Sequence, residues 1–205
     1  MLAMRRFALP IVLILIAVPA AADAVTSSGA GASVAAAAPA PKSPAEVRAD
    51  RLDQLFARLH RAKSTDAAQG PEHDIWALWM TSDSATADAL LGQAARAMND
   101  GAYEPSRRIL DKMVQVYPDY AEAWNKRATL NFVQDRLDDS LADIEHVLAL
   151  EPRHFGALSG KGLVLEKQKK YSDALAALRE ALSINPNMST IVDEIKKIEK
   201  VQRDI

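Results

Sequence analysis

An internal repeat of constant period constrains this chain more strongly than any other feature of its sequence. Pro118, Pro152 and Pro186 are evenly spaced along the chain, and each ends an apolar run: MVQVYP, VLALEP and ALSINP. A shift of the sequence by this spacing aligns two further columns, one large and one always small: Leu90, Trp124 and Leu158; Ala94, Ala128 and Gly162. Such self-similarity is typical of arrays of helix pairs, in which each pair buries its apolar face only against its neighbours.

The repeating unit resembles the tetratricopeptide repeat (TPR) family, whose units of about 34 residues carry the pattern W-x2-L-G-x2-Y, then A-x3-F, then proline. The segment AEAWNKRATLNFVQDRLDDSLADIEHVLALEPRH is the clearest match. The resemblance implies TPR units at 87–120, 121–154 and 155–188. It implies an all-α fold, a short right-handed α-solenoid of TPR helix hairpins. Where the family has leucine, this chain has Gln93, Arg127 and Lys161, so we expect looser packing inside the first helices.

The segments on either side of the three units also have helical patterns. An amphipathic stripe runs from Leu52 to Leu59, and residues 45–86 are expected to form an N-terminal helical hairpin. Residues 53–86 align with the repeat as a degenerate fourth unit; a hairpin unrelated to the repeat is the alternative. Residues 189–205 carry isoleucines at helical spacing and predict a C-terminal capping helix, which Thr190 would cap.

The stretch GALSGKG, residues 156–162, has the composition of a phosphate-binding loop. That loop requires G-x-x-x-x-G-K-[ST] after a strand. Here Gly160 follows Gly156 too closely, Gly162 replaces the Ser or Thr, and the repeat register places the stretch in a first helix. It is therefore interpreted as a packing sequence, and no nucleotide or other cofactor is expected.

The N-terminus has the features of an export signal. MLAMRRFALPIVLILIAVPAAADA has a basic start, an apolar centre and an A-x-A end, which predicts a signal peptide, residues 1–24, cleaved after Ala24. An uncleaved membrane anchor is the alternative, but the uncharged stretch 7–22 is shorter than the roughly 20 residues that a spanning helix needs. Residues 25–44, rich in Ala, Pro and Ser, are expected to be a flexible linker. The protein is thus predicted to be periplasmic or otherwise exported.

Catalytic and metal chemistry find little support in the sequence. It has no cysteine, and its four histidines show no metal-binding spacing. We find no nucleophile elbow, and the net charge of −2 gives no reason to expect a nucleic-acid partner. The chain is therefore predicted to be a non-enzyme without metal or cofactor.

The family resemblance implies a concave groove, lined by the first helices, that holds a peptide or helix of another protein. The implied lining residues are Asp88, Leu91, Met98, Asn99, Glu122, Asn125, Thr129, Phe132, Val133, Ser159, Leu163 and Glu166. With Asp88 and Glu122 at one edge, this groove would suit an apolar segment that carries a basic residue. The expected function is a protein–protein interaction adaptor or scaffold in the cell envelope. A membrane-anchored scaffold with an uncleaved N-terminal helix is the alternative.

Overall fold

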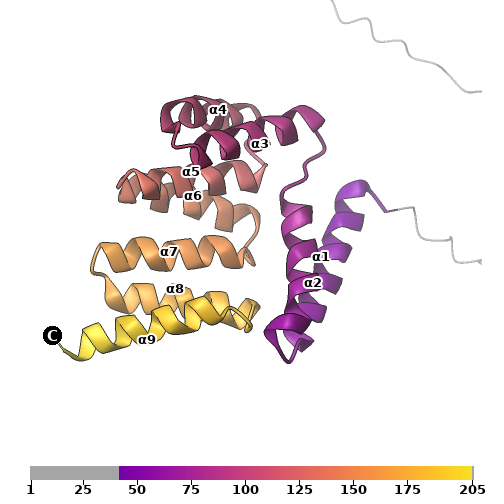
Figure 1. Cartoon of the computed structure of the whole chain (residues 1–205). Helices are drawn as coiled ribbons and strands as arrows, with labels where there is room; N and C mark the ends of the chain where they lie inside the picture. Colours follow the sequence, from indigo (N-terminus) through magenta and orange to yellow (C-terminus); the bar gives the residue numbers. More distant parts are fainter. Residues whose placement is uncertain (1–41, 205) are drawn as a thin grey trace, which may run out of the picture. The chain divides into compact units, whose positions relative to one another are not determined.

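The computed structural model describes residues 42–204, so the predicted signal peptide and nearly all of the predicted linker lie outside the described residues (Figure 1). Within 42–204 the chain forms nine α-helices and no strand. They are α1 Pro44–Arg61, α2 Thr65–Trp79, α3 Ala85–Asn99, α4 Tyr103–Val116, α5 Ala121–Val133, α6 Leu137–Leu150, α7 Phe155–Lys167, α8 Tyr171–Ile184 and α9 Ser189–Arg203. The prediction of an all-α repeat solenoid is confirmed.

The pairs α3–α4, α5–α6 and α7–α8 form successive hairpins that stack on one another (Figure 1). Inside each pair the turn passes through one residue in the left-handed region: Gly101 at φ 75°, Asp135 at φ 61° and Lys169 at φ 61°. These three residues are equivalent by the repeat. Gly101 adopts this conformation without strain because it has no Cβ, whereas Asp135 and Lys169 have a Cβ and are strained in it.

The small column lets the two helices of a pair approach closely. The hydroxyl of Ser106 donates to the carbonyl of Ala94 at 2.9 Å, and that of Ser140 donates to the carbonyl of Ala128 at 2.8 Å. In the third pair the equivalent of these alanines is Gly162. A Cβ built there would lie 2.5 Å from Cγ of Leu178, so this position requires glycine for packing.

Arg127, one of the residues that replaces the family's leucine, does not loosen its helix pair as the sequence suggested. Its guanidinium donates to both carboxylate oxygens of Asp143 on α6, at 2.6 and 3.0 Å, and to Asp111 on α4 at 3.2 Å. The Asp143 side chain is only 3% exposed. A bidentate arginine therefore joins three helices where an apolar contact was expected.

The helices α1 and α2 form a hairpin that starts at a capping box made by Ser43 and Glu46. This hairpin runs across the beginnings of α5, α7 and α9, at the right of Figure 1, and α2 does not pack on α3 in the way that α4 packs on α5. That residues 53–86 derive from a repeat stays a prediction; their packing differs from that of the three TPR units.

The stack of hairpins that begins with α3 ends at α9, which covers α8. Ile191 and Ile198 are buried in the same apolar cluster as Leu178. The helix begins at Ser189 with Met188 at its N-cap and no side-chain cap, so the prediction that Thr190 caps it is wrong. In residues 42–204 no helix is both long and apolar enough to cross a membrane.

Candidate functional site

The concave side between α5 and α7 contains an apolar cavity of about 130 Å³. Its walls come from the two first helices, with α6 beneath them. Gly160 has no side chain to fill the space between the helices, and this leaves it open. The lining residues are Asn125, Ala128, Thr129, Phe132, Ser140, Ile144, Gly156, Ala157, Gly160, Leu163 and Val164.

A second hollow of about 220 Å³ adjoins the first, because Phe132 and Leu163 line both. Its other lining residues are Glu166 and Lys167. The ammonium group of Lys167 lies 5.2 Å from the centroid of the Phe132 ring and pairs with Asp135 at 2.7 Å. This end of the groove therefore has an apolar floor and a charged rim.

Glu166 on this rim is tied to the capping helix. Its carboxylate accepts from Lys197 on α9 at 2.8 Å, and Lys197 also donates to Glu194 at 2.8 Å. Burial raises the pKa of Glu166, and the neighbouring Glu194 adds to this, so the pKa stays above its ordinary value despite the lysine. The lysine is what allows two carboxylates to lie together here.

Five of the predicted groove residues line the two cavities: Asn125, Thr129, Phe132, Leu163 and Glu166. The other predicted residues with side chains open to solvent are Asn99, which is exposed, Val133, which is 48% exposed, and Met98, which packs partly against the core around α3 and α4. Ser159 is buried, and its hydroxyl donates to the carbonyl of Phe155 at 2.7 Å.

Besides Ser159, three predicted contact residues are corrected by the structure. Leu91 and Glu122 are both 0% exposed. Asp88 accepts from the backbone and the hydroxyl of Ser82, at 2.8 and 2.7 Å, and from the hydroxyl of Tyr120 at 3.3 Å. The two carboxylates of the predicted acidic edge are therefore bonded within the chain: Asp88 to the connection between the hairpin and α3, and Glu122 to His154 and Asn125.

Glu122 forms a buried pair with His154, whose Nε2 lies 3.1 Å from Oε1. The Nδ1 of His154 accepts from the backbone N–H of Ala157 at 3.0 Å and caps α7. The proton of the neutral ring must then be on Nε2 and point at Glu122. Burial raises the pKa of Glu122, but the hydrogen bonds from His154 and Asn125 and the nearby charge of Lys126 outweigh it, so the pKa lies below its ordinary value.

Sequence reasoning gave His154 no role, yet a periodic signal for it exists. Tyr120, His154 and Met188 occupy equivalent positions of the repeat and stand at the N-caps of α5, α7 and α9, where Ser, Asn or Asp would be usual. All three contact the hairpin. The hydroxyl of Tyr120 donates to the carbonyl of Met80 at 2.7 Å, His154 stacks on Trp79, and Met188 packs against the hairpin's core.

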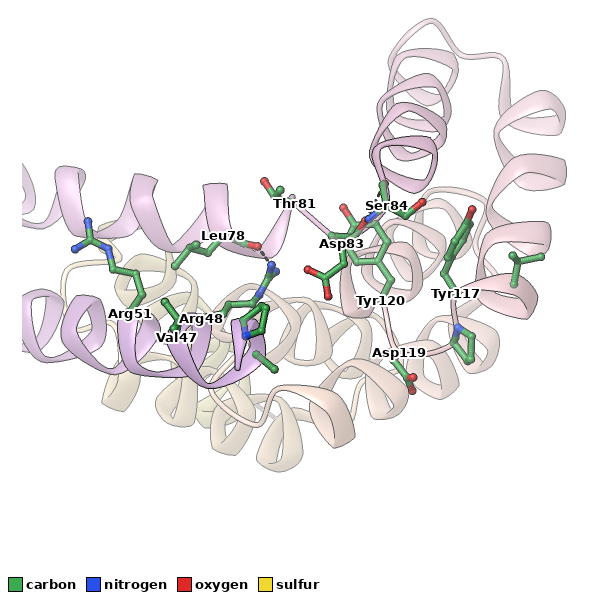
Figure 2. Close-up of a pocket in the computed structure, with 15 residues that line it drawn as sticks. Val47, Arg48, Arg51, Leu78, Thr81, Asp83, Ser84, Tyr117, Asp119 and Tyr120 are labelled. Atoms are coloured by element: carbon green, nitrogen blue, oxygen red, sulfur yellow. Dashed lines mark hydrogen bonds between the residues drawn. The ribbon is translucent and has the colours of Figure 1, made fainter. Parts of the chain in front are cut away.

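A larger cavity, of about 740 Å³, lies between the start of α1, the 81–84 connection and the α4–α5 turn. Figure 2 shows Val47 and Arg48 on one side of it and Tyr117 and Asp119 on the other. Val47 is 54% exposed, and Val116, which also lines the cavity, is 50% exposed. The guanidinium of Arg48 donates to the carbonyl of Leu78. None of these residues was predicted as a site, because they come from segments without a shared sequence pattern.

The described part of the chain, residues 42–204, contains no cluster of three or more His, Cys, Asp or Glu side chains that could hold a metal ion. The arrangement in the groove, apolar hollows with a charged rim, is suited to contact with another macromolecule.

Comparisons with known proteins point to one family. The tetratricopeptide repeat profile matches residues 156–188. A TPR repeat-containing protein of Rhizobium etli is 40% identical over 148 residues, which are 72% of this chain and 72% of that protein.

Among solved structures, the first TPR domain of Spaghetti (RPAP3) bound to the HSP90 peptide SRMEEVD is similar with a TM-score of 0.57 at 21% identity, over 59% of this chain and 96% of that one. The type III secretion translocator chaperone SycD of Yersinia enterocolitica gives a TM-score of 0.56 at 12% identity, over 64% of this chain and 94% of that one. These likenesses show the fold.

Proposed function

Because this chain belongs to the tetratricopeptide repeat family, we propose that it is a protein-binding adaptor whose groove between α5 and α7 holds a segment of another protein. The observation that carries the proposal is the apolar hollow shared by Phe132 and Leu163, which opens on the concave side. An apolar side chain of the partner would enter this hollow. The similar RPAP3 domain was solved with a peptide bound, which supports the same use of the fold.

The partner segment differs from the one that the sequence suggested. Glu122 is buried and Asp88 is bonded within the chain, so a basic residue of the partner would not meet them. The charges that do border the hollows are Lys167 and Glu166, both already paired within the chain. The affinity for the partner segment would therefore come mainly from apolar contact, and the charged rim would set the orientation of that segment in the groove.

We further propose that the protein acts outside the cytoplasm, in the cell envelope. This rests on the sequence of residues 1–24, with its basic start, apolar centre and A-x-A end. The intact mass of the protein recovered from its own cells tests it. A mass without residues 1–24 is expected, whereas a mass that includes them would favour the membrane-anchored scaffold.

The groove is tested by substituting Thr129, an exposed residue of α5 that lines the hollow, with arginine. Ala176→Arg, at an exposed position in the middle of α8, is the matched control. Complexes are fixed chemically in cells, purified on the tagged full chain and quantified by mass spectrometry. We expect at least one protein to be retained by the wild type and by Ala176→Arg but lost by Thr129→Arg. An identical set of retained proteins for all three chains would refute the groove as the binding surface.

A further inference from the structure

The N-terminal hairpin reaches one end of the groove. Gly156 lines the groove cavity, and Trp76 of α2 lies directly on it. A Cβ built at Gly156 would be 2.6 Å from Cη2 and 2.9 Å from Cζ2 of Trp76. The hollow between α5 and α7 is thus continuous with a surface that the chain's own helix covers.

That contact is made by aromatic rings. Trp79 stacks on His154 with ring centroids 4.0 Å apart and planes 10° apart, and it lies 5.1 Å from Phe155. Trp76 meets both rings edge-on, at 5.4 Å from His154 and 5.6 Å from Phe155. Two tryptophans three residues apart on one helix therefore pack against a histidine and a phenylalanine at the start of α7.

Polar contacts surround this aromatic centre. Arg153 pairs with Asp53 of α1 at 2.5 Å, and the side-chain amides of Asn185 and Asn187 donate to Glu72 and to the carbonyl of Ala62, at 3.1 and 3.4 Å. The Arg153–Asp53 pair is exposed, at 39% and 66%, and exposed pairs contribute little. The aromatic contact and the apolar packing around it therefore contribute more to holding the hairpin than this exposed pair does.

The fit of the hairpin is incomplete. The indole N–H of Trp79 is buried without an acceptor among residues 42–204. At this same end of the hairpin, a cavity of about 740 Å³ lies between the start of α1, the end of α2 and the α4–α5 turn (Figure 2). The end of α2 thus combines an unsatisfied donor with an open neighbouring cavity, and a helix packed in this way can be replaced by one that satisfies the same surface better.

We propose that the surface formed by His154, Phe155 and Gly156 is a binding site for an amphipathic helix that presents two aromatic side chains three residues apart. The chain's own α2 occupies this site in the free protein, and a partner helix displaces it. The proposal rests on the proposed function, because it names the class of partner for the same groove. The buried Glu122–His154 pair holds the receiving ring, with the imidazole face turned to the incoming aromatic.

The test uses the full chain, which contains no cysteine of its own. The interface pair is replaced in Asp53→Cys, Arg153→Cys, and a short thiol-reactive cross-linker locks the hairpin in place. The probe is a synthetic peptide of residues 65–80, stapled between positions 69 and 73, whose side chains are exposed in the chain. The control peptide carries Trp76→Ala and Trp79→Ala.

We expect the probe to bind the unlocked chain at least 10-fold more tightly than the cross-linked chain, and the control peptide to bind neither. The chain with Trp79→Ala, whose hairpin has lost its stacking on His154, should bind the probe more tightly than the wild type, because its site is free for a larger fraction of the time. Equal binding to the locked and unlocked chains would overturn the proposal. So would no binding to a Trp79→Ala chain that has kept its helical circular dichroism.

This outcome is independent of the groove test. Suppose that Thr129→Arg loses a cellular partner while the locked and unlocked chains bind the probe equally. The adaptor function would then stand, and the proposal that a partner helix displaces α2 would be refuted. If Thr129→Arg changes nothing while locking abolishes probe binding, the aromatic site stands as a surface of its own and the hollow between α5 and α7 is not used.

Discussion

Two glycines of α7, Gly160 and Gly162, are separated by one residue and should respond in opposite ways to alanine. A Cβ at Gly160 would meet Cδ1 of Ile144 at 3.7 Å, an ordinary contact. A Cβ at Gly162 would lie 2.5 Å from Cγ of Leu178, closer still to its Cδ2, and 3.3 Å from the carbonyl oxygen of Ala174. Leu178 is 0% exposed and cannot turn away, and the carbonyl is backbone.

The magnitudes follow from these distances. Either substitution gains about 1 kcal/mol of helix propensity. Overpacking at Gly162 costs about 1–3 kcal/mol, and the immobile neighbours place it at the upper end. We therefore expect Gly160→Ala to stabilise the chain by about 1 kcal/mol and Gly162→Ala to destabilise it by about 2 kcal/mol.

Urea unfolding followed by circular dichroism measures both effects. With an m-value of about 1–3 kcal/mol/M, the two variants should differ by about 1 M or more in their unfolding midpoints. Equal stabilisation by both alanines would refute the reasoning, because it would mean that α7 and α8 do not approach as closely as the small column requires. A loss of stability in Gly160→Ala would refute it as well.

Three further outcomes are expected. Glu122→Gln should reduce the free energy of unfolding at pH 7, and in urea titrations its difference from the wild type should shrink as the pH falls below 4.5, the ordinary pKa of this carboxyl. A carboxylate whose pKa is lowered in the folded state stabilises the fold above the unfolded pKa and loses this contribution as it is protonated. A difference that is constant with pH would contradict the pairing with His154. Asp143→Ala should cost about 3 kcal/mol in the same assay, since it leaves Arg127 partly buried without its bidentate partner; a loss below about 1 kcal/mol would mean that the pair is solvated. Gly156→Ala should push Trp76 outward and raise acrylamide quenching of tryptophan fluorescence, while the Gly160→Ala chain keeps the wild-type value; no change would show that the hairpin does not lie against α7.

The repeat units were predictable because their determinants recur. A small residue where two helices touch and a proline after each second helix are local requirements that return once in every unit, so the register could be read directly. The same logic applied to the groove: Thr129, Phe132 and Leu163 line the hollow because helical geometry fixes which positions face the concave side.

The docking of the hairpin could not be predicted in this way. It depends on contacts between Trp79 and His154 or Phe155, which are far apart in sequence and occur once. The bounds of its second helix were equally hard to predict, because α2 begins at Thr65 and contains Pro71, a residue that ordinarily interrupts a helix. Because the position of the hairpin could not be predicted, Glu122 was expected to face an open groove, whereas its side chain is buried.

The central claim is that the hollow between α5 and α7 is the working surface, and photo-crosslinking in living cells tests it most directly. Benzoylphenylalanine replaces Phe132 in one chain and Asp139, an exposed residue of α6, in a control chain. The account predicts a discrete protein adduct from position 132 that is absent from position 139. Adducts that are the same from both positions, or none from position 132 in a folded chain, would contradict it.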